Sequence, residues 1–190
     1  MQPPPFFTSS REKRLWIWAG VVLVAIYSGL FLGQPLARLF SNEEITVIIF
    51  ILGMILVGIT ILLYAFRSRP GKVELTVLIG ITAVYVLFFL RLGLPERSHL
   101  MEYSVLAIFI HKAITERIKN GKKIPWPALV AIVITFLIGV LDECLQFIMP
   151  NRVFDTLDIV FNGLVITMAI GSAIILKRIQ NWRIARRKKS

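Results

Sequence analysis

The stretch LIGVLDECLQFIMPNRVFDTLDIVFNGLV, residues 137 to 165, decides how this chain is organised. It joins the end of one apolar segment to the start of the next through a short polar link. Ionisable groups inside membrane-spanning helices are rare and mark functional sites by default. We therefore expect a polar site where these two segments meet. Seven polar side chains of the stretch stand inside or beside the apolar segments: Asp142, Glu143, Gln146, Arg152, Asp155, Asp158 and Asn162.

The composition of the whole chain is that of an integral membrane protein. Of its 190 residues, 56% are hydrophobic and the mean hydropathy is +0.75, whereas soluble domains of this length are usually less apolar. The formal net charge is +11, but the basic residues flank apolar segments and form no compact face. The expected partners are therefore membrane lipids and not nucleic acid. The single cysteine, Cys144, excludes an intramolecular disulfide.

The chain contains several apolar segments of about 20 residues, which is the length that an α-helix needs to cross a bilayer. A sixth segment, Leu100–Ala113, is shorter and has polar residues at both ends, so that it crosses the membrane or forms a re-entrant or interfacial helix. We expect an all-α, polytopic membrane helical bundle of about six transmembrane helices. The five clear spans are Leu15–Gly33, Ile45–Phe66, Leu75–Leu94, Trp126–Ile148 and about Thr156–Leu176, with Gly20, Gly53, Gly58 and Gly80 expected to permit close helix contact.

The distribution of basic residues favours six crossings with both termini in the cytoplasm. In that arrangement all but four of the 22 lysines and arginines lie on the inner side, as the positive-inside rule predicts. Without the sixth crossing, the basic C-terminal tail would lie outside. The four outer basic residues are Arg38, Arg91, Arg97 and Arg152.

This topology divides the chain into four parts. Residues 1–14 are predicted to form a mobile N-terminal tail, because they begin with a proline-rich run that has no apolar period. Residues 15–94 contain three spans, and the first of these is too long for a secretion signal and lacks a clear cleavage site. Residues 95–180 contain three spans with the polar motifs, and residues 181–190 form a basic cytoplasmic tail.

The polar residues of the last three spans fall at one membrane depth, near the outer side. Their spacings of three, four and seven residues put each set on one helix face, so that three faces can converge on one pocket. Asp155 and Asp158 have a second explanation as N-cap and first-turn acids of the last span. The sets are His99, Glu102 and Tyr103; Asp142 and Gln146; and Asp155, Asp158 and Asn162, with Glu143 next to the second set and Arg152 in the loop.

Carboxylates outnumber arginines in this outer layer. Either some carboxyls are protonated, or His99 is charged, or a cation or cationic ligand completes the site. The chain has no H-E-x-x-H zinc motif, and the sequence alone predicts no metal site and indicates no particular cofactor.

Two motifs resemble those of the VanZ-like family of bacterial membrane proteins. PERSHLMEY, residues 95 to 103, is similar to the family's E-R-x-H-x-x-E-Y block. LDECLQFIMPNRVFDTLDIVFNGL, residues 141 to 164, is similar to the pattern D-E-x-x-Q, P-x-R and D-x-x-D-x-x-x-N-G. The resemblance covers about residues 95–171 and departs at Thr167, where members often have a second glycine. It implies a multi-pass protein of the bacterial cytoplasmic membrane. The founding member is associated with low-level glycopeptide resistance, notably to teicoplanin, by an unsettled mechanism.

Three hypotheses of function follow. In the first, the outer pocket binds a phospholipid headgroup, a lipid-linked cell-wall precursor or a lipoglycopeptide drug, with Arg152 pairing a phosphate. In the second, the chain is an intramembrane enzyme acting on an envelope lipid or glycan, with His99 as general acid/base and Glu102 or Asp142 as its partner. In the third, it transports protons or cations, which is disfavoured because no charged path continues inward from the polar layer.

Overall fold

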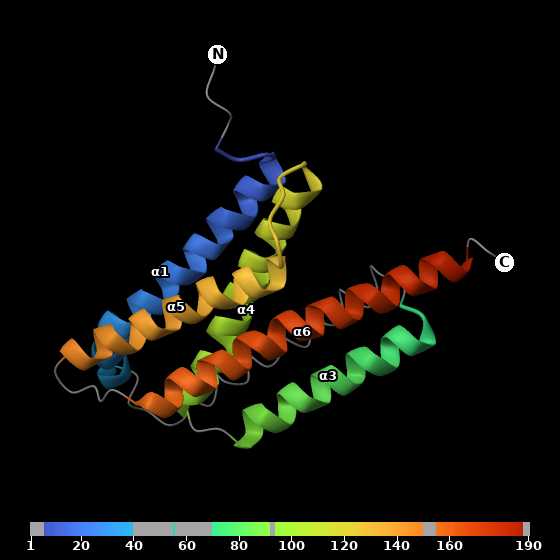
Figure 1. Ribbon diagram of the computed structural model, residues 1–190. Helices are drawn as coiled ribbons and strands as arrows, with labels where there is room; N and C mark the ends of the chain where they lie inside the picture. The colour runs from blue at the N-terminus through green and yellow to red at the C-terminus, as the bar shows by residue number, and fades with distance from the viewer. Residues whose placement is uncertain (1–5, 40–54, 56–69, 92–93, 150–154, 188–190) are drawn as a thin grey trace, which may run out of the picture. The chain divides into compact units, whose positions relative to one another are not determined.

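The computed structural model describes residues 6–39, 55, 70–91, 94–149 and 155–187, and its regular elements there are all helical (Figure 1). Apart from Ile55, the predicted span Ile45–Phe66 lies outside the described residues. The prediction of an all-α chain is confirmed for the rest. The helices are α1 (Ser10–Leu39), α3 (Lys72–Arg91), α4 (Leu94–Lys119), α5 (Pro127–Ile148) and α6 (Thr156–Arg187).

Three of the described helices, α3, α5 and α6, are long and apolar enough to cross a membrane. They correspond to the predicted spans Leu75–Leu94, Trp126–Ile148 and Thr156–Leu176. Large apolar side chains on them are exposed, among them Ile79, Leu137 and Val160. Exposed large apolar side chains along a helix of this length are typical of a lipid-facing surface. The chain is therefore a membrane protein.

The chain divides into two compact units. The first comprises Met1–Tyr27 and Leu87–Ile174, and the second comprises Ser28–Val86 and Ile175–Ser190. The first unit holds α4, α5, the beginning of α1 and most of α6. The second holds most of α3 and the last turns of α6.

Helix α4 supplies much of the core of the first unit. It packs against α5, and the ring of its Phe109 stacks on Trp18 of α1 with centroids 6.4 Å apart. At about 1.5 Å of rise per residue, its 26 residues extend about 39 Å, although the apolar segment Leu100–Ala113 looked short. The helix continues through the polar residues at both ends of that segment, of which His99 and Tyr103 are buried and Lys112 is exposed. Its buried apolar residues recur every three or four positions: Leu100, Tyr103, Leu106, Ala107, Ile110, Ala113 and Ile114.

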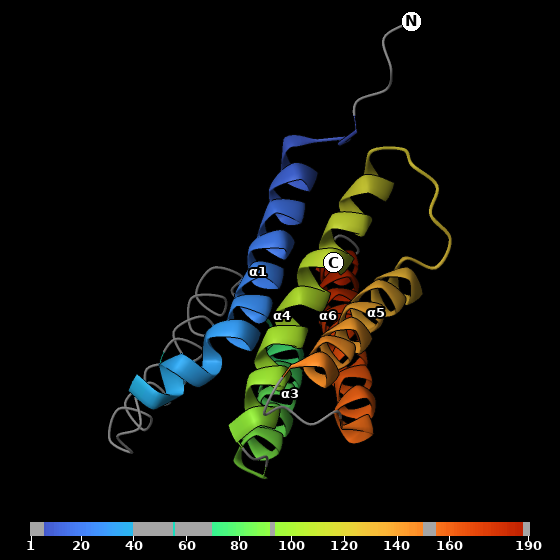
Figure 2. The ribbon, with the colours of Figure 1, turned by 90° about the vertical axis from the view of Figure 1, so that its left-hand side faces the viewer.

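The described N-terminal residues lie against the C-terminal end of α4 (Figure 2). Ser9 Oγ accepts a hydrogen bond from the backbone N–H of Glu12 (3.0 Å), and Glu12 Oε2 accepts from the N–H and hydroxyl of Thr8 (2.7 and 2.6 Å). Arg117 Nε lies 3.1 Å from Glu12 Oε1. The helix therefore begins at Ser10, inside the tail predicted for residues 1–14, because Ser9 and Glu12 form a variant of the Ser-x-x-Glu capping box in which the carboxylate accepts from Thr8 and not from Ser9. Because the start of α1 lies against the end of α4, the two helices run antiparallel.

Acid is expected to release this N-terminal anchor. Glu12 is fully buried, which by itself raises its pKa, but hydrogen bonds from Thr8 and the charge of Arg117 hold the pKa below the usual 4.5. The stabilisation from ionised Glu12 is therefore complete above pH 4.5 and is lost as the pH falls through the folded-state pKa. Glu12→Gln should cost about 1–3 kcal/mol of local stability at pH 7.

Hydrogen–deuterium exchange of the first turns of α1 measures this effect, with wild type and variant compared at each pH. The difference should be large at pH 7 and should disappear once the pH has fallen below the lowered pKa of Glu12. Glu116→Gln is the control, because Glu116 makes only longer ion pairs with Arg11 and Lys119 (3.8 and 3.6 Å). A difference between wild type and Glu12→Gln that does not change with pH would contradict the assignment.

In the second unit a buried ion pair joins α3 to the last turns of α6. Arg183 Nη1 lies 2.9 Å from Glu74 Oε2, and the Glu74 side chain is completely buried. The guanidinium of Arg186 lies over the Trp182 ring, 4.0 Å from its centroid. The tail predicted for residues 181–190 is thus helical through Arg187, because its basic side chains find partners along the helix.

Candidate functional site

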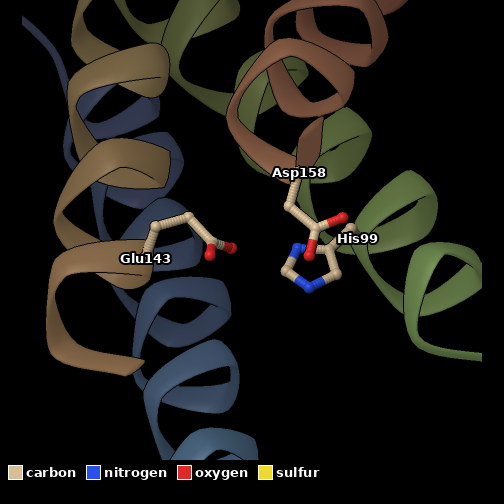
Figure 3. A group of neighbouring side chains, drawn as sticks. All are labelled: His99, Glu143 and Asp158. Carbon is tan, nitrogen blue, oxygen red and sulfur yellow. The ribbon is translucent and has the colours of Figure 1, made fainter. Parts of the chain in front are cut away.

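Three side chains from three helices converge within the first unit. His99 comes from the first turns of α4, Glu143 from the last turns of α5 and Asp158 from the first turn of α6. One nitrogen or oxygen from each lies within 4.8 Å of the other two. Figure 3 shows the three side chains directed toward one another from their separate helices. The two sequence motifs therefore meet in space.

A hydrogen-bonded layer connects this group to Tyr103 and Asp142. The Tyr103 hydroxyl donates to Asp142 Oδ2 over 3.0 Å. Gln146 Nε2 lies 3.4 Å from the same oxygen and 3.3 Å from Glu143 Oε1, so that its amide donates to both acids. The rings of His99 and Tyr103 stack with an interplanar angle of 4° and centroids 5.7 Å apart. These contacts orient His99 and Glu143.

The site contains buried polar atoms that no other described residue satisfies. Glu143 and Asn162 are fully buried, and His99 is nine-tenths buried. Glu143 Oε2, His99 Nδ1 and both polar atoms of the Asn162 amide have no hydrogen-bond partner among the described residues. Each such atom costs about 1–3 kcal/mol. Buried polar atoms without a partner are expected at a site that binds a ligand or an ion.

The local sequence places these side chains by helical spacing. The inner face of α5 buries Thr135, Gly139, Asp142, Glu143 and Gln146, which recur every three or four residues. A Cβ on Gly139 would lie 3.4 Å from the Tyr103 ring and 3.5 Å from Asn162, so this position lets α4 and α6 approach α5 closely. Sequence analysis overlooked Gly139, although the small residues Ala131, Thr135 and Gly139 recur every four positions on this face.

The two acids at the start of α6, Asp155 and Asp158, differ in their roles. Asp155 is exposed, and its Oδ1 accepts a hydrogen bond of 2.8 Å from the N–H of Leu157, which is the geometry of an N-cap. Asp158, half-buried, turns toward His99 and Glu143 instead. Capping therefore accounts for Asp155 and not for Asp158.

The predicted catalytic pair, His99 and Glu102, is not what the group of three contains. Glu102, named with His99 as a catalytic candidate, is partly buried and lies outside the group of three. Glu143 and Asp158 accompany His99 in place of Glu102 or Asp142. Arg152 lies outside the described residues.

No family model, no curated protein and no solved structure matches this chain. The site and its two motifs are therefore what indicates a function. A buried imidazole between two carboxylates can transfer a proton, hold a cation or accept hydrogen bonds from a polar ligand. Tyr103 and Asp142 have already paired with each other, which leaves Glu143, His99 and Asn162 with polar atoms for these tasks.

Proposed function

We propose that this chain is a VanZ-like protein of the bacterial cytoplasmic membrane whose polar site binds the headgroup of an envelope lipid, a lipid-linked cell-wall precursor or a lipoglycopeptide such as teicoplanin. The observation that carries the proposal is the convergence of His99, Glu143 and Asp158. Each belongs to one of the motifs that resemble the family. Motif residues that are distant in sequence and close in space favour a common site over separate structural roles.

The proposed topology has six spans and both termini in the cytoplasm. Glu12 and Arg117 bring the start of α1 to the end of α4, where the basic residues gather. The group of three belongs to the opposite end of α4, at His99. With the basic end inside, as the positive-inside rule requires, the polar site faces the extracytoplasmic surface. A headgroup or drug with a lipid tail can reach such a site from the outer leaflet.

The chemistry of the site fits a ligand with hydrogen-bond donors or positive charge. Glu143 Oε2 and the Asn162 amide oxygen are buried acceptors without described partners. Amines, sugar hydroxyls and amide N–H groups would satisfy them, and all occur in cell-wall precursors and glycopeptides. Arg152, in the loop between α5 and α6, would pair with phosphate.

A second candidate function is an intramembrane enzyme acting on an envelope lipid or glycan. The proximity of His99 to two carboxylates favours it, because a carboxylate orients an imidazole and stabilises its protonated form. Lipid analysis of a deletion strain distinguishes the candidates. An altered lipid or precursor that wild type restores and His99→Ala does not restore would favour the enzyme.

The binding function is tested by teicoplanin susceptibility in a sensitive bacterium that expresses the chain. Wild type is expected to raise the inhibitory concentration, and Glu143→Gln and Arg152→Gln to return it to the empty-vector value. Cys144→Ser is the matched control, because this exposed neighbour of Glu143 lies outside the group of three. Membrane levels of all variants are compared by immunoblot. Equal protection by wild type and both variants would refute the proposed site.

A further inference from the structure

We propose that His99, Glu143 and Asp158 bind one divalent transition-metal ion, Zn²⁺ or a cation with similar ligand preferences. The donor set is one imidazole nitrogen and two carboxylate oxygens. Imidazole selects Zn²⁺, Fe²⁺ and related ions over Mg²⁺ and Ca²⁺, and carboxylates complete such sites in metalloenzymes. The adjacent thiol, Cys144, is exposed and belongs to no such group.

The spacing of the three donors is close to that of a metal site. With Zn²⁺–ligand bonds of about 2.1 Å, tetrahedral ligand atoms lie about 3.4 Å apart. The three donor atoms already lie within 4.8 Å of one another. A contraction of up to about 1.4 Å, through rotation of the Glu143 and Asp158 side chains, would complete the geometry. Figure 3 shows the Asp158 carboxylate beside the His99 ring and the Glu143 carboxylate directed toward both.

Electrostatics favours a cation at this position. Glu143 is fully buried, and no lysine or arginine among the described residues forms an ion pair with it. Two carboxylates beside each other in a membrane helix bundle repel, and a divalent ion would neutralise both. A bound cation is also one of the three ways to balance the excess of carboxylates, Glu143 and Asp158 among them, that the sequence places in the outer layer.

Two buried atoms lack the partners that a purely structural cluster would provide. His99 Nδ1 and Glu143 Oε2 are both inaccessible and accept or donate no hydrogen bond among the described residues. The other Glu143 oxygen is held by Gln146, as outer-shell groups hold metal ligands. A metal ion would thus bind His99 and Glu143, whose side chains are held in place but each have one buried atom without a described partner.

Three protein ligands leave at least one coordination position open. An ion held in this way can accept a water molecule or a phosphate or carboxylate oxygen of a ligand. This use of the ion rests on the proposed function, whereas binding of the ion itself does not. The two claims are therefore tested separately.

The test is metal binding by the purified full-length protein in detergent, with an affinity tag that contains no histidine. The protein is stripped with chelator, equilibrated with buffered Zn²⁺ or Mn²⁺, desalted and analysed by elemental mass spectrometry. We expect one ion per chain for at least one of the two metals. His99→Asn and Glu143→Gln should each weaken binding by about 100-fold or more.

Two matched variants control for nonspecific binding. His111→Asn removes the other histidine of the chain, which is on the same helix, and Cys144→Ser removes the only thiol. Both should bind metal as wild type does. Circular dichroism and size exclusion verify folding, and if Glu143→Gln fails to fold, the half-buried Asp158→Asn replaces it. Absorption of bound Co²⁺ should change in the ligand variants only.

Two results would overturn the metal site: wild type that retains neither ion, or controls that lose as much affinity as the ligand variants. Specific metal binding combined with unchanged drug susceptibility and an unchanged lipid profile would preserve the metal site and remove the proposed functions. If the protein binds no metal but still protects against the drug in a way that depends on Arg152, the metal site is refuted and the proposed binding function is kept.

Discussion

Replacement of Arg183 by alanine is expected to destabilise the contact between α3 and the last turns of α6 by about 3–5 kcal/mol. The Glu74 carboxylate is completely buried and lies 2.9 Å from the Arg183 guanidinium. Without that guanidinium, the carboxylate would keep its desolvation cost and lose its counter-charge. The alkyl part of Arg183 also covers Gly71, where a Cβ would lie 3.0 Å from its Cδ. The variant therefore loses packing as well as charge.

Hydrogen–deuterium exchange of the last turns of α6 measures this loss, because it reports local opening. Arg186→Ala is the matched control, since this exposed arginine makes only a cation–π contact with Trp182, worth about 0.5–1 kcal/mol. The double variant Glu74→Ala/Arg183→Ala should recover part of the loss, because no buried charge remains. Equal exchange in Arg183→Ala and Arg186→Ala would show that the ion pair contributes little.

Features that depend on one helix at a time could be predicted from the sequence. The span Trp126–Ile148 differs from α5 by a single residue at its start. The spacing of Asp142 and Gln146 correctly placed both on one face, where the amide of Gln146 now contacts Asp142. Apolar runs and periods of three and four residues are local properties, and they are fixed by helix geometry.

Features that depend on the rotation of one helix against another could not be predicted. Asp142 and Glu143 are adjacent in sequence and both buried, yet Asp142 pairs with Tyr103 while Glu143 approaches His99. Adjacent residues point about 100° apart around a helix, so only the orientation of α5 decides which acid meets the imidazole. Glu102 is only three residues from His99 in sequence, but sequence distance does not determine which helix faces align.

A second group of features could have been found in the sequence. Ser9 and Glu12 form a capping box with the standard spacing, which the proline-rich beginning of the chain obscured. Among the described residues, two of the glycines expected to permit close helix contact make none: a Cβ on Gly20 or Gly80 would meet no described atom within 4 Å. Gly53 and Gly58 lie outside the described residues. Close approach occurs at Gly139, beside the polar site.

Gly139→Leu is expected to separate α5 from α4 and α6 and to disrupt the polar site. A Cβ alone would lie 3.4 Å from the Tyr103 ring and 3.5 Å from the Asn162 side chain, which is ordinary contact. Gly139→Ala should therefore be tolerated, with a gain of up to about 1 kcal/mol from helix propensity. The further carbons of leucine would have to displace a fully buried tyrosine or asparagine, at a cost of about 1–3 kcal/mol or more.

Thermal unfolding of the purified variants, followed by circular dichroism in detergent, measures this difference. Gly20→Leu is the matched control, because it makes the same change where a Cβ meets nothing within 4 Å. Gly139→Leu should unfold at a lower temperature than wild type and lose Zn²⁺ or Mn²⁺ binding, because its three proposed ligands no longer converge. Gly139→Ala and Gly20→Leu should keep both properties. If Gly139→Leu matched Gly20→Leu in both measurements, the close packing of Tyr103, Gly139 and Asn162 would not be what holds the three helices around the site.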